Sequence, residues 1–286
     1  MPGEVFGFLG TNGAGKTTTI SILCQEFLPT SGSAAICGYD VVEEGKEALQ
    51  CIGYCPQFDA TLDLLTVEEH LRLYCGIHGI VEDMHESVVE ALLQLCDVAK
   101  YRKTLAHELS GGNRRKLSVA ISLVGGPRVV LLDEPSAGMD PVARRGLWTT
   151  IQKAASYCSV VLTTHNLEEV EALADTVAIM VDGSLRCIGD KVHLKNKYGS
   201  GYEMHIRIAR AEAGEAIERF VNDVFPGATL NEFRGHRFVY ALPRDTALSD
   251  AFRILQMNKE ALGITDYSVS QTSIEQVFLR VSGEEV

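Results

Sequence analysis

The stretch Gly10-Thr11-Asn12-Gly13-Ala14-Gly15-Lys16-Thr17-Thr18 decides the fold of this chain of 286 residues. It satisfies the pattern G-x-x-x-x-G-K-[ST], in which a glycine-rich loop turns backbone N–H groups toward a phosphate. An apolar run at residues 5–9 precedes the loop, and we predict a helix from Lys16 onward whose positive end faces the same cavity. A glycine-rich turn with a surface lysine is the competing interpretation, which the agreement of strand, spacing and helix disfavours. The stretch therefore predicts a polyphosphate site.

The residues of this loop have separate expected roles. We expect Lys16 to bridge the terminal phosphates of a nucleotide and the Thr17 hydroxyl to ligate Mg²⁺, while main-chain N–H groups hold the remaining oxygens. The predicted nucleotide-binding positions in the loop are Gly10, Asn12, Gly13, Ala14, Gly15, Lys16, Thr17 and Thr18.

The composition excludes some classes of protein. Lys and Arg number 26 against 38 Asp and Glu, which gives a net charge of −12 and argues against nucleic acid as a partner. The eight cysteines are scattered, and the pair Cys51 and Cys55 has no second pair at zinc-site spacing, so we expect free thiols in a reducing compartment. No run approaches 18 apolar residues and no signal peptide is evident, so we expect a polypeptide that does not itself cross a bilayer.

Strand and helix patterns alternate through the first two thirds of the chain. Apolar strands are predicted at residues 34–37, 52–55, 129–132 and 159–163, and helices at 16–26, 84–96, 110–124 and 144–155, with a terminal hairpin at 176–188. A capping-box sequence, Thr66-Val67-Glu68-Glu69, predicts a further helix start. The alternation predicts a largely parallel sheet.

A second domain is predicted from about residue 200. The strand and helix patterns there follow the order βαββαβ, which is typical of small ferredoxin-like domains. Between the two domains, Lys191, His193, Lys195 and Lys197 form a basic patch on a short helix. A solvated helix face is favoured there over contact with an anionic membrane surface.

Carboxylates and a histidine follow two of the buried strands. Asp133 and Glu134 end the strand at residues 129–132, at the sheet edge where the phosphate loop is expected. We expect Asp133 to hold Mg²⁺ and Glu134 to orient, or accept a proton from, the water that attacks the γ-phosphorus. His165 follows the next strand and is placed to contact the γ-phosphate; a lone histidine there is more often structural, but the order of motifs favours the functional interpretation. Gln57, in a loop after a strand, is a candidate Mg²⁺ ligand.

A second helix start has the chemistry of an anion site. Ser110, Gly111, Gly112 and Asn113 open the helix at residues 110–124. A capping turn without a ligand would explain Ser110 but not two adjacent glycines. Because one nucleotide needs only one cradle, we expect this second end to serve another subunit.

These motifs together resemble the nucleotide-binding domain of an ABC transporter. The resemblance covers about residues 3–190 and rests on the order of residues 10–17, Gln57, the signature at residues 109–113, Glu134, Asp140 and His165. The Ser-Gly-Gly-Asn signature, residues 133–141 with Arg144 and Arg145, and the tail at residues 266–278 are similar to the A subfamily, where such a tail belongs to a regulatory domain after the second nucleotide-binding domain. The resemblance implies a P-loop NTPase fold at residues 1–198, with a helical subdomain at about 60–125, followed by an α+β ferredoxin-like regulatory domain at 199–286.

The resemblance also implies an activity and partners. In that family two such domains close head to tail on two ATP molecules, so Ser110 and Gly112 would contact the γ-phosphate held by the partner, and Asp140 would lie at the dimer contact. The implied protein is an ATPase at the cytoplasmic face of a membrane that moves lipids or sterols. The segment at residues 58–65 would touch the transmembrane domains, which this chain does not contain.

Two departures and one alternative qualify this reading. Asn113 stands where the family signature more often has glutamine, and only four residues precede the first predicted strand, so we expect the start, with its adenine-stacking aromatic residue, to be missing. The alternative function is a nucleotide-dependent binding or regulatory module that does not drive transport. The acidic balance, the loop at Phe58 and the tail disfavour ATPases of the repair and translation branches.

Overall fold

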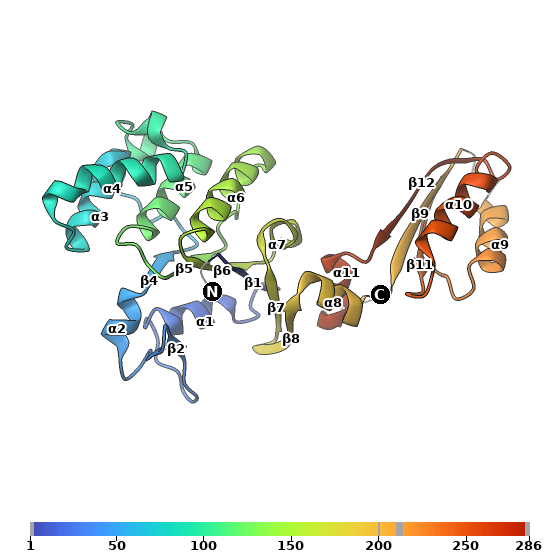
Figure 1. The fold of residues 1–286 in the computed structure, drawn as a ribbon, viewed down its shortest axis with the longest axis horizontal. Helices are drawn as coiled ribbons and strands as arrows, with labels where there is room; N and C mark the ends of the chain where they lie inside the picture. The colour runs from blue at the N-terminus through green and yellow to red at the C-terminus, as the bar shows by residue number, and fades with distance from the viewer. Residues whose placement is uncertain (1–2, 200, 210–213, 284–286) are drawn as a thin grey trace. The chain divides into compact units, whose positions relative to one another are not determined.

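The computed structural model describes residues 3–199, 201–209 and 214–283. Contacts divide the chain into two compact units, Met1–Asp190 and Lys191–Val286 (Figure 1). The resemblance implied a boundary between the domains after residue 198, beyond the short helix that carries the basic patch. In the structure this helix, α8 (Lys191–Tyr198), lies in the second unit, because it packs against α11 (Ile274–Ser282) and the Tyr198 carbonyl accepts a hydrogen bond from Arg280 at 3.1 Å.

A six-stranded sheet forms the middle layer of the first unit. Its strand order is β4 (Ile52–Cys55), β5 (Val129–Asp133), β6 (Ser159–Thr164), β1 (Val5–Gly10), β7 (Thr176–Val181) and β8 (Ser184–Asp190). Neighbouring strands are parallel except β7 and β8, which form the predicted terminal hairpin. The central strands β5 and β6 are rich in Val and Leu because helices cover both faces of the sheet.

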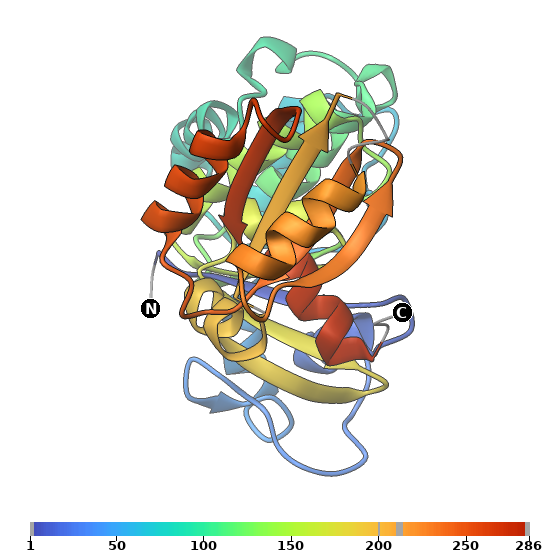
Figure 2. The same ribbon diagram turned by 90° about the vertical axis from the view of Figure 1, so that its right-hand side faces the viewer.

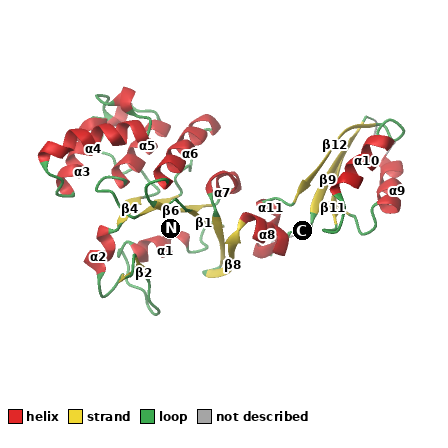
Figure 3. Cartoon of the chain, in the orientation of Figure 1, coloured by secondary structure: helices red, strands yellow, loops and turns green. Residues whose placement is uncertain are grey.

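Helices lie on both sides of these strands, with α1 and α2 on one side and α5, α6 and α7 on the other (Figure 3). The bounds are α1 (Lys16–Leu23), α2 (Gly45–Gln50), α3 (Val67–Ile77), α4 (Glu82–Leu95), α5 (Gly111–Ser122), α6 (Pro141–Ala155) and α7 (Leu167–Leu173), with short 3₁₀ turns η1 (Ala99–Tyr101) and η2 (Ala106–Glu108) and a small ribbon of β2 (Ala35–Ile36) and β3 (Tyr39–Asp40). The first helix is shorter than the predicted 16–26, because Gln25 has a left-handed backbone with φ 61° that ends the helix.

Side-chain caps fix where several of these helices begin. The predicted capping box of α3 is confirmed: Thr66 Oγ1 accepts from the Glu69 N–H at 3.2 Å, and the Glu69 carboxylate accepts from the Thr66 N–H at 2.7 Å. Asp140 caps α6, so that helix begins at Pro141 rather than at the predicted residue 144.

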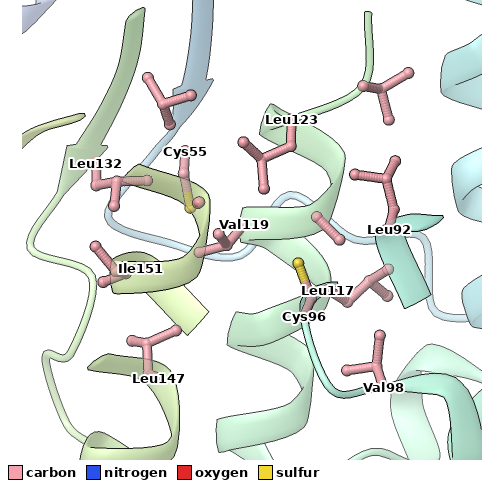
Figure 4. Packing of buried hydrophobic residues seen from close by; sticks show 14 of the residues in the cluster. Cys55, Leu92, Cys96, Val98, Leu117, Val119, Leu123, Leu132, Leu147 and Ile151 are labelled. Atoms are coloured by element: carbon pink, nitrogen blue, oxygen red, sulfur yellow. The ribbon is translucent and has the colours of Figure 1, made fainter. Parts of the chain in front are cut away.

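Helix α5 occupies the centre of the first unit's hydrophobic core. Figure 4 shows Leu117 and Val119 of α5 between Leu92 of α4 on one side and Leu132 of β5 and Ile151 of α6 on the other. Each fully buried leucine contributes about 1.5–3 kcal/mol to folding. The helices between β4 and β5 therefore share one core with the sheet.

The second unit has the predicted βαββαβ order. Its sheet runs β10 (Thr229–Arg234), β11 (Arg237–Leu242), β9 (Tyr202–Ile208) and β12 (Ile264–Gln271), with every neighbouring pair antiparallel. Helices α9 (Gly214–Val224) and α10 (Leu248–Asn258) lie on the same face of this sheet (Figure 2). Their apolar side chains meet Met204, Ile206 and Phe238 in a separate core. Across the described ranges of both units, no helix has the length and apolar content needed to span a bilayer.

Candidate nucleotide site

The loop after β1 is shaped by glycines that no other residue can replace without strain. Gly13 and Gly15 have left-handed backbones, with φ of 82° and 103°. A Cβ atom on Gly10 would lie 2.7 Å from the Met180 carbonyl oxygen, and one on Gly15 would lie 3.1 Å from the Met180 methyl group. The absence of side chains at Gly10 and Gly15 therefore lets Met180 of β7 pack directly against the loop.

Lys16 begins α1, and its ammonium group is turned into the loop. Its side chain is 6% exposed; Nζ donates to the carbonyl oxygens of Gly10 at 2.8 Å and Thr11 at 3.1 Å, and it lies 3.4 Å from Glu134 Oε1. The cation is thus held at the mouth of the loop by oxygen atoms that a phosphate oxygen can replace.

Strand register brings the acidic residues to the loop. Asp133 pairs with Thr163 across β5 and β6, and Leu9 pairs with Thr164 across β1 and β6. Thr17 Oγ1 donates to Asp133 Oδ1 at 3.3 Å, and the Thr163 hydroxyl donates to the same oxygen. A hydroxyl and a carboxylate in contact are the hard oxygen ligands that Mg²⁺ prefers, so this pair fits the ion.

Glu134 has an unusual backbone and a fully engaged side chain. Its φ is 47°, in the left-handed region, and its N–H donates to the carbonyl and hydroxyl oxygens of Thr163, each at 3.1 Å. The carboxylate is 8% exposed and lies between Lys16 Nζ and His165 Nδ1, which is 2.8 Å from Glu134 Oε2. A strained backbone at a buried carboxylate is a common feature of functional sites.

A cavity of about 270 Å³ opens between these groups. It is lined by Asn12, Gly13, Lys16, Thr17, Thr18, Gln57 and Glu134. The structure thus brings together five of the predicted loop residues with Gln57 and Glu134, and Asp133 and His165 contact this lining, whereas Gly10, Ala14 and Gly15 are not part of it. Its described lining contains none of Ser110, Gly111, Gly112, Asn113 or Asp140.

The signature residues form a separate helix start. Ser110 Oγ accepts from the Asn113 N–H at 3.4 Å and caps α5. A Cβ atom on Gly112 would lie 2.9 Å from Ala143 Cβ of α6, whereas one on Gly111 would meet no atom within 4 Å. Helix packing therefore accounts for Gly112, and Gly111 is the signature glycine that this chain's own packing leaves unexplained.

Comparisons with known proteins follow the same division of the chain. Residues 1–137 match the ABC transporter family model, and residues 199–271 match the model of the ABCA1-like, C-terminal R1 regulatory domain. The chain is 46% identical over 282 residues to the phospholipid-transporting ATPase ABCA3 of Homo sapiens, a match that covers 97% of this chain and 16% of that protein. It is 44% identical over 288 residues to ATP-binding cassette sub-family A member 7 of Mus musculus, covering 99% of this chain and 13% of that protein.

This chain belongs to the A subfamily of ABC transporters. It spans less than a fifth of the length of these relatives. Among solved structures, the ATP-binding subunit of an ABC transporter is similar, with a TM-score of 0.60 and 27% identity, over 69% of this chain and 82% of that one. The α/β fold expected of an ABC nucleotide-binding domain is confirmed by this likeness.

Buried charged residues of this ABC domain that were not recognised from the sequence include Glu169 and Arg115. Glu169 of α7 is fully buried, burial raises the pKa of its carboxyl group, and Trp148 Nε1 donates to it at 3.1 Å. Arg115 of α5 is 5% exposed. A weak signal was available: Arg115 lies four residues before Val119 and eight before Leu123, so a cation falls on the helix face that also carries these buried apolar residues and Ser118.

Proposed function

We propose that this chain binds Mg-ATP at the loop of residues 10–18 and hydrolyses it as the ATP-binding domain of a transporter. The observation that carries this proposal is the Glu134 carboxylate, buried between Lys16 and His165 at the wall of the cavity. A carboxylate fixed at that point can orient a water molecule toward a γ-phosphorus and accept its proton.

The roles of the side chains follow from their contacts. Lys16 would exchange the carbonyl oxygens of Gly10 and Thr11 for oxygens of the β- and γ-phosphates. Water attacks the γ-phosphorus, the bond to the β–γ bridging oxygen breaks, and Glu134 takes the proton. His165 holds Glu134 in place and donates toward the γ-phosphate.

Thr17, Asp133 and Gln57 are the residues that would hold Mg²⁺. All three side chains offer oxygen atoms. Two of these atoms, Thr17 Oγ1 and Asp133 Oδ1, are already in contact through a hydrogen bond. When bound, the ion would neutralise negative charge on the β- and γ-phosphates.

The wider assembly is part of the same proposal. We propose that the open helix end at Ser110 and Gly111, which lies outside the cavity, completes the site of a second nucleotide-binding domain, with Asp140 near that contact. The relatives named phospholipid-transporting ATPases support a lipid as the transported molecule. Phe58, Leu62 and Leu64 are 79%, 52% and 81% exposed, which suits contact with transmembrane domains and a place at the cytoplasmic face of a membrane.

Steady-state hydrolysis of Mg-ATP by the chain and by Glu134→Gln tests the catalytic part. We expect the variant to lose at least about 100-fold in kcat, because it cannot accept the proton, and to keep ATP affinity within a few fold. It should also form a twofold assembly with Mg-ATP, as measured by light scattering. Equal, background-level turnover in both proteins would favour the alternative, a nucleotide-dependent module that does not hydrolyse ATP.

A further inference from the structure

Helix α5 carries a buried guanidinium that joins two loops of the candidate site. Arg115 donates to the carbonyl oxygens of Pro56 at 2.6 Å, Pro135 at 2.8 Å and Asp133 at 2.9 Å. It also pairs with Asp59, Nη1 to Oδ1, at 3.1 Å. One side chain therefore uses most of its donors on two segments that are far apart in the sequence.

The two segments are those that present Gln57 and Glu134 to the cavity. Pro56 and Asp59 flank Gln57, and the carbonyl groups of Asp133 and Pro135 flank Glu134. Most of the acceptors are main-chain oxygens, so Arg115 constrains backbone position rather than side-chain charge. Glu134 needs such a constraint, because its left-handed φ of 47° persists only where surrounding contacts impose it.

Asp59 connects this arrangement to the exposed apolar segment. Its Oδ1 atom accepts from Ser118 Oγ at 2.8 Å as well as from Arg115, so two residues one turn apart on α5 hold it. Phe58, the adjacent residue, is 79% exposed. Phe58 is therefore connected to Arg115 through Asp59 by a few covalent and hydrogen bonds.

We propose that Arg115 is a positioning residue that couples the loop of residues 56–59 to the backbone on either side of Glu134. When a partner displaces the segment at Phe58, Arg115 moves the carbonyl groups of residues 133–135 with it and changes where the Glu134 carboxylate points. Arg115 lies outside the residues that line the cavity, so it acts on hydrolysis only through these groups. This proposal rests on the proposed ATPase function.

Kinetics of Arg115→Lys test the role in hydrolysis. Lysine keeps the charge but cannot reach both segments in the planar geometry of a guanidinium. We expect kcat to fall at least about tenfold while KM for Mg-ATP changes less than about threefold, because nucleotide contacts are intact. Arg114→Lys is the matched control: its guanidinium bonds to the Ala106 carbonyl and lies 3.8 Å from Asp63, both outside residues 56–59 and 133–135, and its kcat should stay within about twofold. A kcat for Arg115→Lys within twofold of the wild type overturns the proposal.

A double-mutant cycle with Asp59→Asn tests the connection to the Phe58 segment. If Asp59 acts through Arg115, the loss of kcat in the double variant should equal that of Arg115→Lys alone within about twofold. Multiplied losses in the double variant would mean that the two residues act separately, which contradicts the coupling.

Hydrogen–deuterium exchange of the full chain tests the same claim without turnover. In Arg115→Lys, peptides covering residues 56–59 and 133–135 should both exchange faster than in the wild type and Arg114→Lys. Faster exchange in one segment only, in neither, or throughout the first unit, overturns the coupling. A wild-type chain without ATPase activity would count against the proposed function alone, because this readout needs no hydrolysis.

Discussion

Helices α1 and α5 both have glycines at their N-termini in sequences that favour anion binding, yet the two N-termini are built differently. The N-cap of α1 is Gly15, which offers no side-chain oxygen, and the helix start lines a cavity beside the Lys16 ammonium group. The N-cap of α5 is Ser110, whose hydroxyl accepts from the helix's own Asn113 N–H. Neither helix has an acidic residue in its first turn. The α1 end thus lies beside a cavity and a buried lysine, which suits the phosphate binding that we propose, whereas the α5 end is capped by the chain's own serine and lies outside that cavity.

Replacing Lys16 should remove the positive charge that distinguishes the N-terminus of α1 from that of α5. We expect Lys16→Ala to weaken Mg-ATP binding on the order of 100-fold, or about 3 kcal/mol, because a buried charge-assisted contact to phosphate is lost. Isothermal calorimetry measures the affinity. Lys46→Ala, an exposed lysine on α2, serves as the control and should bind as the wild type does. An affinity for Lys16→Ala equal to that of the wild type would contradict the assignment of the α1 end as the phosphate site.

The backbone conformation at the N-terminus of α1 should also restrict which residues can replace its glycines. Gly15→Ala places a Cβ atom at φ 103° and 3.1 Å from the Met180 methyl group, so we expect a loss of about 2–3 kcal/mol in the free energy of unfolding. Gly13→Ala has a similar φ of 82° but open space around its Cβ position, and should lose only about 1 kcal/mol. Urea unfolding of both variants checks the difference. Equal losses would show that contact with Met180 does not constrain the loop.

Helix α3 has a third kind of N-terminus, because its first turn carries two acidic residues of the chain itself, Glu68 and Glu69. Glu68 in its first turn accepts from Arg102 at 2.7 and 2.9 Å and from Arg72 at 3.0 Å, and these hydrogen bonds lower its pKa from 4.5 to about 2. Because the pKa is lower in the folded chain, the stabilisation is complete above pH 4.5 and is lost as the pH falls toward 2. Allowing for solvent screening, we expect it to be about 1–2 kcal/mol.

Glu68→Gln tests this pH dependence. The difference in unfolding free energy between the wild type and the variant should be about 1–2 kcal/mol at pH 7 and should shrink steadily below pH 4.5. Urea titrations at pH 7, 4 and 3 measure it. A difference that stays constant with pH would mean that the variant acts through packing rather than through the charge of Glu68.

Local signals in the sequence predicted most of the fold and most of the α1 site. The alternation of strands and helices, the capping box at Thr66 and the order βαββαβ each depend on residues close together in the chain, and the structure contains all three. The cluster of Lys16, Asp133 and Glu134 followed from the rule that parallel strands end at a shared edge.

Features that depend on contacts between distant segments were not predicted. Arg115 can be recognised as a cation on a mostly buried helix face, but its partners at Pro56 and Pro135 follow only from the packing of α5 between two loops. The early end of α1 depends on the left-handed backbone of Gln25, a residue type that rarely adopts it. Both glycines of the signature were assigned to anion binding, whereas the need for Gly112 is set by Ala143 of α6, the next helix in the chain.

The variants Gly111→Ala and Gly112→Ala test whether the N-terminus of α5, unlike that of α1, acts on a nucleotide held by a partner. Gly112→Ala should lose about 1–2 kcal/mol of stability, because its Cβ atom meets Ala143. Gly111→Ala should change stability by less than about 0.5 kcal/mol, since its Cβ position is open and alanine favours the helix. If the α5 end completes a partner's site, Gly111→Ala should nevertheless lower ATP turnover at least about tenfold while leaving ATP affinity of the separate chain unchanged. Unchanged turnover in this variant would leave α5 as a capped helix and nothing more, because the one signature glycine without a packing role would then also have no role in catalysis.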